Sequence, residues 1–465
     1  MVNWHGSRGV VACVALSLFC LSGCAKPQEK PQGTGGAGGS SASSANGSKA
    51  PGHRESTPPT AAAVNVSDAN TAKENAALAN HVKAAKVRID ALGSRSKYAP
   101  KDGDVLTEIV IPDGSSLNAD DLELFGKLSD LEKLQILNCR KLNDEMAAKL
   151  SGLKGLTDLA LTNSVINDVT VEMIVKSFPE LTDLNLSSNT NMTNGVVKII
   201  SGLSNLQSLT LIQNKVNDIG AQRLSKLKEL RSLDLRGNME AGDMALEVVS
   251  ELPELTAFKH RSTAVTDSGL EYLSRNQTLE SLLVQDFAIT DQSGPHISKL
   301  GKLSQLEIFR CQGFGSEGVL ALKGMGLVRL TLRDLPNVDD RAMVVFDDLP
   351  KLQRLYLHEL ATVSDSGLKH LSTLKSLELL DIWTVPQMTD ATVDIIATLP
   401  HLKELSIRAT GVTDTSIDKL LTIPSLQSLT FKENGSVTAE GLKKFASRKW
   451  SKLDLGTAGT ADSGN

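Results

Sequence analysis

The chain has 465 residues, a formal net charge of −5 and a pI near 6.0. A chain of this length ordinarily forms two or three domains, and its charge excludes a global attraction to nucleic acid, so any basic surface must be local. Aromatic residues make up only 3% of the sequence, which fits a core built from leucine, isoleucine and valine.

The first segment, residues 1–23, has the size and flanks of a signal peptide. Its apolar run over residues 9–21 is too short for a bilayer span, which needs about 20 residues. The sequence LSGC at residues 21–24 resembles a bacterial lipobox, and this resemblance implies cleavage before Cys24 and acylation of that cysteine, a stable membrane anchor. Ala25 replaces the Asp that retains enteric-type lipoproteins in the inner membrane, which favours the outer membrane. A plain secretory signal with a chance cysteine is the alternative.

Two segments of different character follow. Residues 24–66 are rich in Gly, Ser and Pro and predict a disordered, lipid-anchored tether with a reach of about 35 Å. Residues 67–95 predict a helix, because apolar residues recur there at spacings of four and three: Leu78, Val82, Ala85, Ile89 and Leu92. Such a helix would cap the open end of a repeat array; a short oligomerising coil or an isolated stalk are the alternatives.

A repeat fills most of the remaining chain, and residues 206–229 are one copy of it. Leu206, Leu209 and Leu211 form an LxxLxL pattern that predicts a strand, and Asn217 and Asp218 precede an apolar run that predicts a capped helix. The leading leucines of the copies are Leu106, Leu131, Leu156, Leu181, Leu206, Leu230, Leu255, Leu279, Leu306, Leu327, Leu352, Leu377, Leu402 and Leu426, with a fragment at Leu453 and Leu455. Most steps are 24 or 25 residues, a period typical of solenoids. The steps around Leu306 are 27 and 21, so the longer unit, which contains Pro295, is expected to hold an inserted loop, either merely tolerated or a contact element.

The repeats resemble a known family at several points. LNLSSN at residues 184–189 and LDLRGN at residues 233–238 match the core of leucine-rich repeats, and VTDSGLEYL at residues 265–273 looks like the cysteine-containing subclass best known from F-box substrate receptors. The resemblance implies an α/β leucine-rich repeat solenoid, or horseshoe, of about 14 repeats over residues 96–455. Parallel strands would line its concave face and short helices its convex face, and residues 456–465 would form a disordered tail.

One repeat position is acidic in ten copies. A metal ladder is one interpretation, but each carboxylate would open its own helix, so we interpret the column as helix caps. Asn194, Ser316 and Ala439 replace the acid in three copies. The ten residues are Asp144, Asp168, Asp218, Asp243, Asp267, Asp291, Asp340, Asp365, Asp390 and Asp414.

Cys139 and Cys311 lie in units seven steps apart, more than roughly 30 Å, which is too far for a disulfide. We interpret both as small core residues, and His260, in an inward column, as a core residue too. The sequence contains no GxSxG, GxxxxGKS, HExxH or CxxC motif, so no enzyme, cofactor or metal is expected.

The candidate site is the concave face of the later repeats. The early repeats, from Leu131 to Leu206, are nearly neutral there, whereas the repeats from Leu230 to Leu402 set eight bases against Asp234, Asp381 and Glu404. Tyr356, His358 and Trp383 share these columns, and aromatic residues and arginine are typical of interaction hot spots. The bases are Arg236, Lys259, Arg261, Arg310, Arg329, Arg333, Arg354 and Arg408. A merely solvated strand face is the alternative.

The sequence therefore predicts a non-enzymatic, monomeric protein-interaction module, lipid-anchored in the bacterial cell envelope on the periplasmic side or the cell surface. Its expected partner is acidic, a protein or an anionic envelope polymer and not nucleic acid. A structural envelope lipoprotein without a ligand is one alternative, and an F-box-like adaptor, implied by the repeat resemblance only, is another.

Overall fold

A computed structural model describes residues 61–93, 97–101 and 105–456. The predicted signal peptide, Cys24, most of the predicted tether and nearly all of the predicted tail lie outside these residues. The chain divides into two units, residues 1–63 and 64–465, and all described residues except 61–63 belong to the second.

The described part contains one 16-stranded sheet in which the strands follow chain order. Strands β2 to β16 are parallel, and β1 is antiparallel to β2. The strands are β1 (Lys97–Lys101), β2 (Val105–Ile111), β3 (Lys133–Ile136), β4 (Asp158–Leu161), β5 (Asp183–Asn185), β6 (Ser208–Thr210), β7 (Ser232–Asp234), β8 (Ala257–Arg261), β9 (Ser281–Gln285), β10 (Gln305–Phe309), β11 (Arg329–Arg333), β12 (Arg354–His358), β13 (Leu379–Trp383), β14 (Glu404–Arg408), β15 (Ser428–Lys432) and β16 (Lys452–Asp454).

Short helices connect the strands. The α-helices are α1 (Ala61–Ala91), α2 (Ala119–Phe125), α3 (Asp144–Ala148), α4 (Asp168–Ser177), α5 (Val196–Ile200), α6 (Asp218–Ala221), α7 (Asp243–Ser250), α8 (Asp267–Leu273), α9 (Ser293–Ser298), α10 (Ser316–Leu320), α11 (Asp365–Leu368), α12 (Asp390–Ile396), α13 (Thr415–Leu421) and α14 (Ala439–Lys443). The 3₁₀ helices are η1 (Lys149–Gly152), η2 (Gln222–Lys226), η3 (Asp340–Asp348), η4 (Lys369–Thr373) and η5 (Lys444–Ser447).

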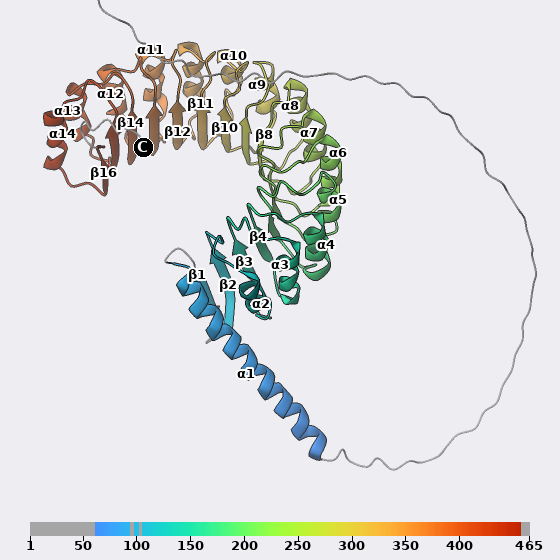
Figure 1. Ribbon diagram of the computed structural model, residues 1–465. Helices are drawn as coiled ribbons and strands as arrows, with labels where there is room; N and C mark the ends of the chain where they lie inside the picture. Colours follow the sequence, from blue (N-terminus) through green and yellow to red (C-terminus); the bar gives the residue numbers. More distant parts are fainter. Residues whose placement is uncertain (1–60, 94–96, 102–104, 457–465) are drawn as a thin grey trace, which may run out of the picture. The chain divides into compact units, whose positions relative to one another are not determined.

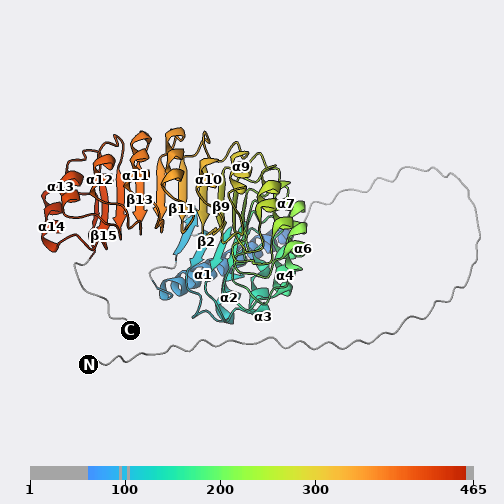
Figure 2. The ribbon, with the colours of Figure 1, turned by 90° about the horizontal axis from the view of Figure 1, so that it is seen from above.

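The LxxLxL pattern builds this architecture because its last two apolar residues point to the same side of every strand. Leu306, Leu330 and Leu355 are aligned across β10, β11 and β12, and all three are buried. Strands line the inner side of the curve and helices the outer side (Figure 1, Figure 2). The predicted fold, an α/β leucine-rich repeat horseshoe of about 14 repeats, is confirmed.

The predicted irregularity around Leu306 is wrong. Leu306 pairs with Leu282 of β9 and Leu330 of β11, which are the second leucines of their patterns. The leading residue of this repeat is therefore Leu303, and both steps around it are 24 residues. Pro295 lies inside the ordinary helix α9, so this unit holds no inserted loop. The error arose because Leu303, which starts a pattern with Leu306 and Ile308, and Leu306 itself can each be taken as the leading leucine when the neighbouring repeats are ignored.

The N-terminal end of the solenoid is covered by α1 and β1. Val82, Ala85 and Ile89 are buried against the core, and Leu78 and Leu92 are partly buried, as expected for a capping helix. The helix begins at Ala61, six residues before the predicted start at residue 67, and ends at Ala91. Within the described ranges, none of the helices combines the length and apolarity that a membrane crossing requires.

The acidic column does not cap its own helices, which corrects the prediction. Most of these helices are capped by the residue before the acid, as Ser364 caps α11 by accepting a hydrogen bond from the backbone N–H of Ser366. The acid lies at or just before the first helical residue, and it accepts hydrogen bonds from the next repeat. Asp365 accepts from Thr389 N at 2.9 Å, Thr389 Oγ1 at 2.6 Å and Thr392 Oγ1 at 2.5 Å.

This contact recurs without a break through twelve repeats, and we call it the inter-repeat ladder. Asn194 and Ser316, two of the apparent exceptions, accept the equivalent backbone hydrogen bonds from Asn217 and Asp339. Where the cap position of the next helix is glycine, the ladder residue caps that helix itself: Asp218 accepts from Ala245 N, and Asp291 accepts from Gly318 N. The ladder residues are Asp144, Asp168, Asn194, Asp218, Asp243, Asp267, Asp291, Ser316, Asp340, Asp365, Asp390 and Asp414.

The isolated polar core positions behave as expected. Cys139 and Cys311 are free and buried in the described chain, and burial raises the pKa of Cys311 to about 12. His260 is fully buried, with Nδ1 3.0 Å from Leu235 O and Nε2 2.8 Å from Ala241 O. Burial also lowers the pKa of His260, so this histidine is a neutral core residue and not an exposed ligand.

Candidate binding face

Strands β10 to β14, together with the bend after β10, carry a continuous stack of arginine and aromatic side chains on the concave side, which we call the stacked row. Its members are Arg310, Phe309, Arg333, Trp383 and Arg408. The guanidinium groups of Arg310 and Arg333 both lie over the ring of Phe309, 4.5 and 4.3 Å from its centroid. Arg333 and Arg408 lie 5.3 and 5.1 Å from the ring centroid of Trp383. Because cations bind to the faces of aromatic rings, each member holds its neighbour in place.

Carboxylates fix the guanidinium groups of this row. Arg310 donates to Asp286 at 2.7 and 3.0 Å, Arg333 lies 3.4 Å from Glu359, and Arg408 lies 3.1 Å from Asp381. Burial alone would raise the pKa of Asp286, but hydrogen bonds from Arg310 and Arg261 outweigh it and hold that pKa below its usual value. The row is therefore preorganised, with most of its charge matched internally.

Five of the eight predicted bases are paired in this way. Arg236 forms an ion pair with Asp234 at 2.7 Å, and Arg261 shares Asp286 with Arg310. Among the described residues, no carboxylate lies within ion-pair distance of Lys259, Arg329 or Arg354. The paired bases are Arg236, Arg261, Arg310, Arg333 and Arg408.

The three predicted aromatic residues lie together on β12 and β13. The ring of Tyr356 meets His358 edge to face at 6.0 Å, and His358 meets Trp383 at 5.7 Å. Nε2 of His358 lies 3.4 Å from Asp381. Arg329 lies over Tyr356, 4.8 Å from its ring centroid. Tyr356, His358, Trp383 and Arg329 therefore form one surface with the stacked row.

The corrected register changes the composition of the face. Arg310 is not a strand residue: it follows β10 at a bend with a φ of 52°, in the column that also contains Asp286, Asp334 and Glu359. With the register corrected, Glu307 and Phe309 occupy concave positions of β10. Phe309 was not predicted because its repeat was misaligned, although its spacing from Leu303 matches that of Arg333 from Leu327.

The face is also less basic than its three strand columns alone indicate, because the next column outward holds Asp286, Asp334 and Glu359, as the sequence already showed, and the corrected register adds Glu307. From β7 to β14, counting the bend after each strand, the eight bases face seven carboxylates, a formal excess of one positive charge. The carboxylates are Asp234, Asp286, Glu307, Asp334, Glu359, Asp381 and Glu404. Arginine and aromatic content, more than net charge, distinguishes this half of the concave side.

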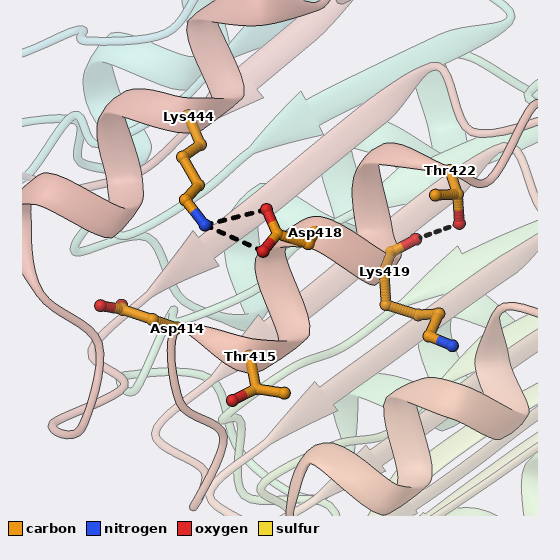
Figure 3. A pocket seen from close by; sticks show the side chains of 6 residues that line it. All are labelled: Asp414, Thr415, Asp418, Lys419, Thr422 and Lys444. Atoms are coloured by element: carbon orange, nitrogen blue, oxygen red, sulfur yellow. Dashed lines mark hydrogen bonds and ion pairs between the residues drawn. The ribbon is translucent and has the colours of Figure 1, made fainter.

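The convex side offers a weaker candidate. A shallow pocket is lined by α13 and η5, and Figure 3 shows Lys444 donating to both carboxylate oxygens of Asp418 at 2.9 Å. Lys419 pairs with Asp394 of α12 at 2.9 Å. Its lysines are thus already paired, and no group of three metal-binding side chains is found in the described ranges.

Comparisons with known proteins agree with the architecture. A family model described as leucine rich repeat matches residues 179–239. A chain in the crystal structure of the yeast complex of Rad7 and Elc1 has 17% sequence identity and a TM-score of 0.51, with 88% of this chain and 97% of that chain covered. An internalin from Listeria monocytogenes has 18% identity and a TM-score of 0.47, with 73% of this chain and 90% of that chain covered.

The matched family model, the Rad7–Elc1 structure and the sheet described above define a leucine-rich repeat solenoid. The likeness to the solved structures is one of fold. Repeat solenoids of this kind generally use their concave side as an extended binding surface.

Proposed function

We propose that this protein is a non-enzymatic interaction module whose concave face binds a protein partner through the stacked row and the adjoining Tyr356. The observation that carries the proposal is the row itself, because tryptophan, tyrosine and arginine dominate interaction hot spots. A preorganised surface loses little side-chain entropy on binding, and the cation–π contacts and ion pairs provide this order.

The partner that suits this face contains both apolar and acidic groups. The rings of Phe309, Tyr356 and Trp383 offer apolar contact, whereas Arg329 and Arg354, which lack an ion-pair partner among the described residues, favour an acidic group. An anionic envelope polymer is a poorer match than the sequence suggested, because its regularly repeated charge would also meet the seven carboxylates.

A pull-down from detergent-solubilised envelope, with the full chain as bait, tests this function. Trp383→Ala should lose the partners that the wild type retains, because it removes the ring between Arg333 and Arg408. Ile212→Ala is the matched control, since Ile212 occupies the same column after β6, in the early repeats. If Trp383→Ala and Ile212→Ala retain the same proteins as the wild type, the stacked row is not a binding site, and a structural envelope role would replace the proposal.

The envelope location is part of the proposal and rests on the LSGC sequence at residues 21–24. Lipidation at Cys24 would tether the solenoid to a membrane, with outer-membrane sorting favoured by Ala25. Metabolic labelling with palmitate should mark the wild type and not Cys24→Ala. Label that persists on Cys24→Ala, or that is absent from the wild type, would remove the anchor from the proposal.

A further inference from the structure

Two arginines without an ion-pair partner in the described part of the chain lie side by side on the concave face. Arg329 and Arg354 occupy the same register position on β11 and β12, so their Cα atoms are about 4.8 Å apart. We propose that their guanidinium groups together bind one carboxylate of the partner, an Asp or Glu side chain or a chain terminus. This inference rests on the proposed function and names the chemical group that the concave face recognises.

The unfavourable position of the two charges supports a binding role. Like charges directly opposite each other on neighbouring strands destabilise a sheet. The arginines of the stacked row each have a carboxylate partner, such as Asp286 for Arg310 and Asp381 for Arg408. Nothing equivalent is found for Arg329 and Arg354 among the described residues, so the folded chain keeps a repulsion that a bound carboxylate would relieve.

The surroundings orient this pair toward a ligand. The guanidinium of Arg329 lies over the ring of Tyr356 at 4.8 Å, which restricts its position. Thr331, two residues further along β11 on the same concave side, has a buried hydroxyl that finds no hydrogen-bond partner among the described residues. Guanidinium groups that are held in place bind carboxylates in a two-point geometry, as Arg310 does with Asp286 at 2.7 and 3.0 Å.

The neighbouring charges favour a single carboxylate over a run of them. Glu307 lies on β10 in register with Thr331, and Glu404 lies on β14 two strands from Arg354. Both are carboxylates without an ion-pair partner in the described chain. A polyanion laid across these strands would meet them, whereas one acidic group placed between the two arginines would not.

Two short capped peptides test the recognition directly on the full chain. The probes are N-acetyl-Ala-Glu-Ala-amide and its neutral isostere N-acetyl-Ala-Gln-Ala-amide, with binding measured by saturation-transfer NMR. The wild type should bind the Glu peptide about tenfold more tightly than the Gln peptide, since hydrogen bonds to charged groups are the stronger kind. Arg329→Gln and Arg354→Gln should each abolish this preference. Lys259→Gln, at the unpaired base on β8, is the matched control and should keep it.

Arg354→Glu separates recognition from folding. It should abolish the preference for the Glu peptide and yet raise the melting temperature by about 1 °C, because Glu at this position can pair with Arg329. A wild type that shows no preference, or arginine variants that bind the Glu peptide as the wild type does, would overturn the inference. In the envelope pull-down, partners lost from Trp383→Ala but retained by Arg354→Glu would overturn it as well while leaving the proposed function intact.

Discussion

At the scale of single residues, the ladder aspartates show how one side chain can join two repeats. Asp365 lies at the start of α11 but makes its three hydrogen bonds to Thr389 and Thr392 of the next repeat. A carboxylate in this position therefore stabilises the interface between repeats more than the helix that carries it.

Asp365→Ala should lower the free energy of unfolding by about 2 kcal/mol, because it leaves the donors of the next repeat without their charged acceptor. Urea denaturation of the full chain measures the change. Asp365→Asn should cost less, since Asn194 already serves the ladder with an amide oxygen.

Asp394→Ala is the control for the loss of an acid. Asp394 lies in α12 with 62% of its side chain exposed, and among the described residues it forms an ion pair with Lys419 alone. Its replacement should change stability by less than about 0.5 kcal/mol. Equal, small effects of Asp365→Ala and Asp394→Ala would show that the ladder hydrogen bonds contribute little.

At the scale of elements, α1 closes the open end of the core. Ile89 is fully buried against the first repeats, whereas Val87, two residues earlier, is 65% exposed. In a solenoid each repeat contacts only its neighbours, so stability is close to a sum of local terms. Damage to the cap should therefore remain near the N-terminal end.

Ile89→Ala should destabilise this end by about 3 kcal/mol through lost burial and the cavity left behind. Hydrogen exchange measured by mass spectrometry should show faster exchange in β2 and α2, with β10 to β14 unchanged. Val87→Ala should leave the exchange as in the wild type. Uniformly faster exchange across all strands would mean that the solenoid unfolds as a single cooperative unit.

The small residues at the third helical position also depend on a neighbouring element. A Cβ on Gly220 would lie 2.0 Å from Asn194 Oδ1, and one on Gly441 would lie 2.2 Å from Asp414 Oδ1. The ladder residue of the preceding repeat occupies that space. The repeat before helix α3 has the short side chain of Ala119 at the ladder position. The third residue of α3 is accordingly the larger Met146.

At the scale of the whole molecule, the ladder makes stability depend on pH. Burial alone would raise the pKa values of Asp267, Asp365 and Asp390, but hydrogen bonds from the next repeat outweigh it and hold them below the usual value. Hydrogen bonding from Thr438 lowers the pKa of Asp414 in the same way. A depressed folded-state pKa contributes stability that is present above the unfolded pKa, about 3.9 for Asp, and lost as pH falls through the folded pKa.

The full chain should therefore lose stability steeply below about pH 4. Thermal unfolding followed by circular dichroism between pH 7 and pH 3 measures this. The double variant Asp365→Asn, Asp390→Asn should be less stable than the wild type at pH 7 and should lose less stability per pH unit on acidification. A wild type and double variant with parallel profiles would contradict the assignment of these two groups.

Much of the architecture follows from the sequence by itself. A period of 24 or 25 residues with LxxLxL in each copy requires a parallel strand and a helix per repeat, because neither can bury its apolar side alone. Spacing predicted the inward positions of Leu330 and Leu355 and the burial of the two cysteines. It also predicted which side of α1 carries the apolar residues. Spacing also placed Arg333, Trp383 and Arg408 in one column, since equal offsets from the leading leucine put side chains on the same line.

Only the tertiary structure decided which repeat each polar group serves. Asp365 and Thr389 are 24 positions apart in the sequence, and nothing local shows that the first accepts from the second. The register of the repeat at Leu303 required its neighbours β9 and β11, because its own leucines fit two alignments. The pairing of Arg310 with Asp286 and the absence of a described partner for Arg329 likewise depend on contacts between strands, and these contacts determine which charges on the concave face stay available to a ligand.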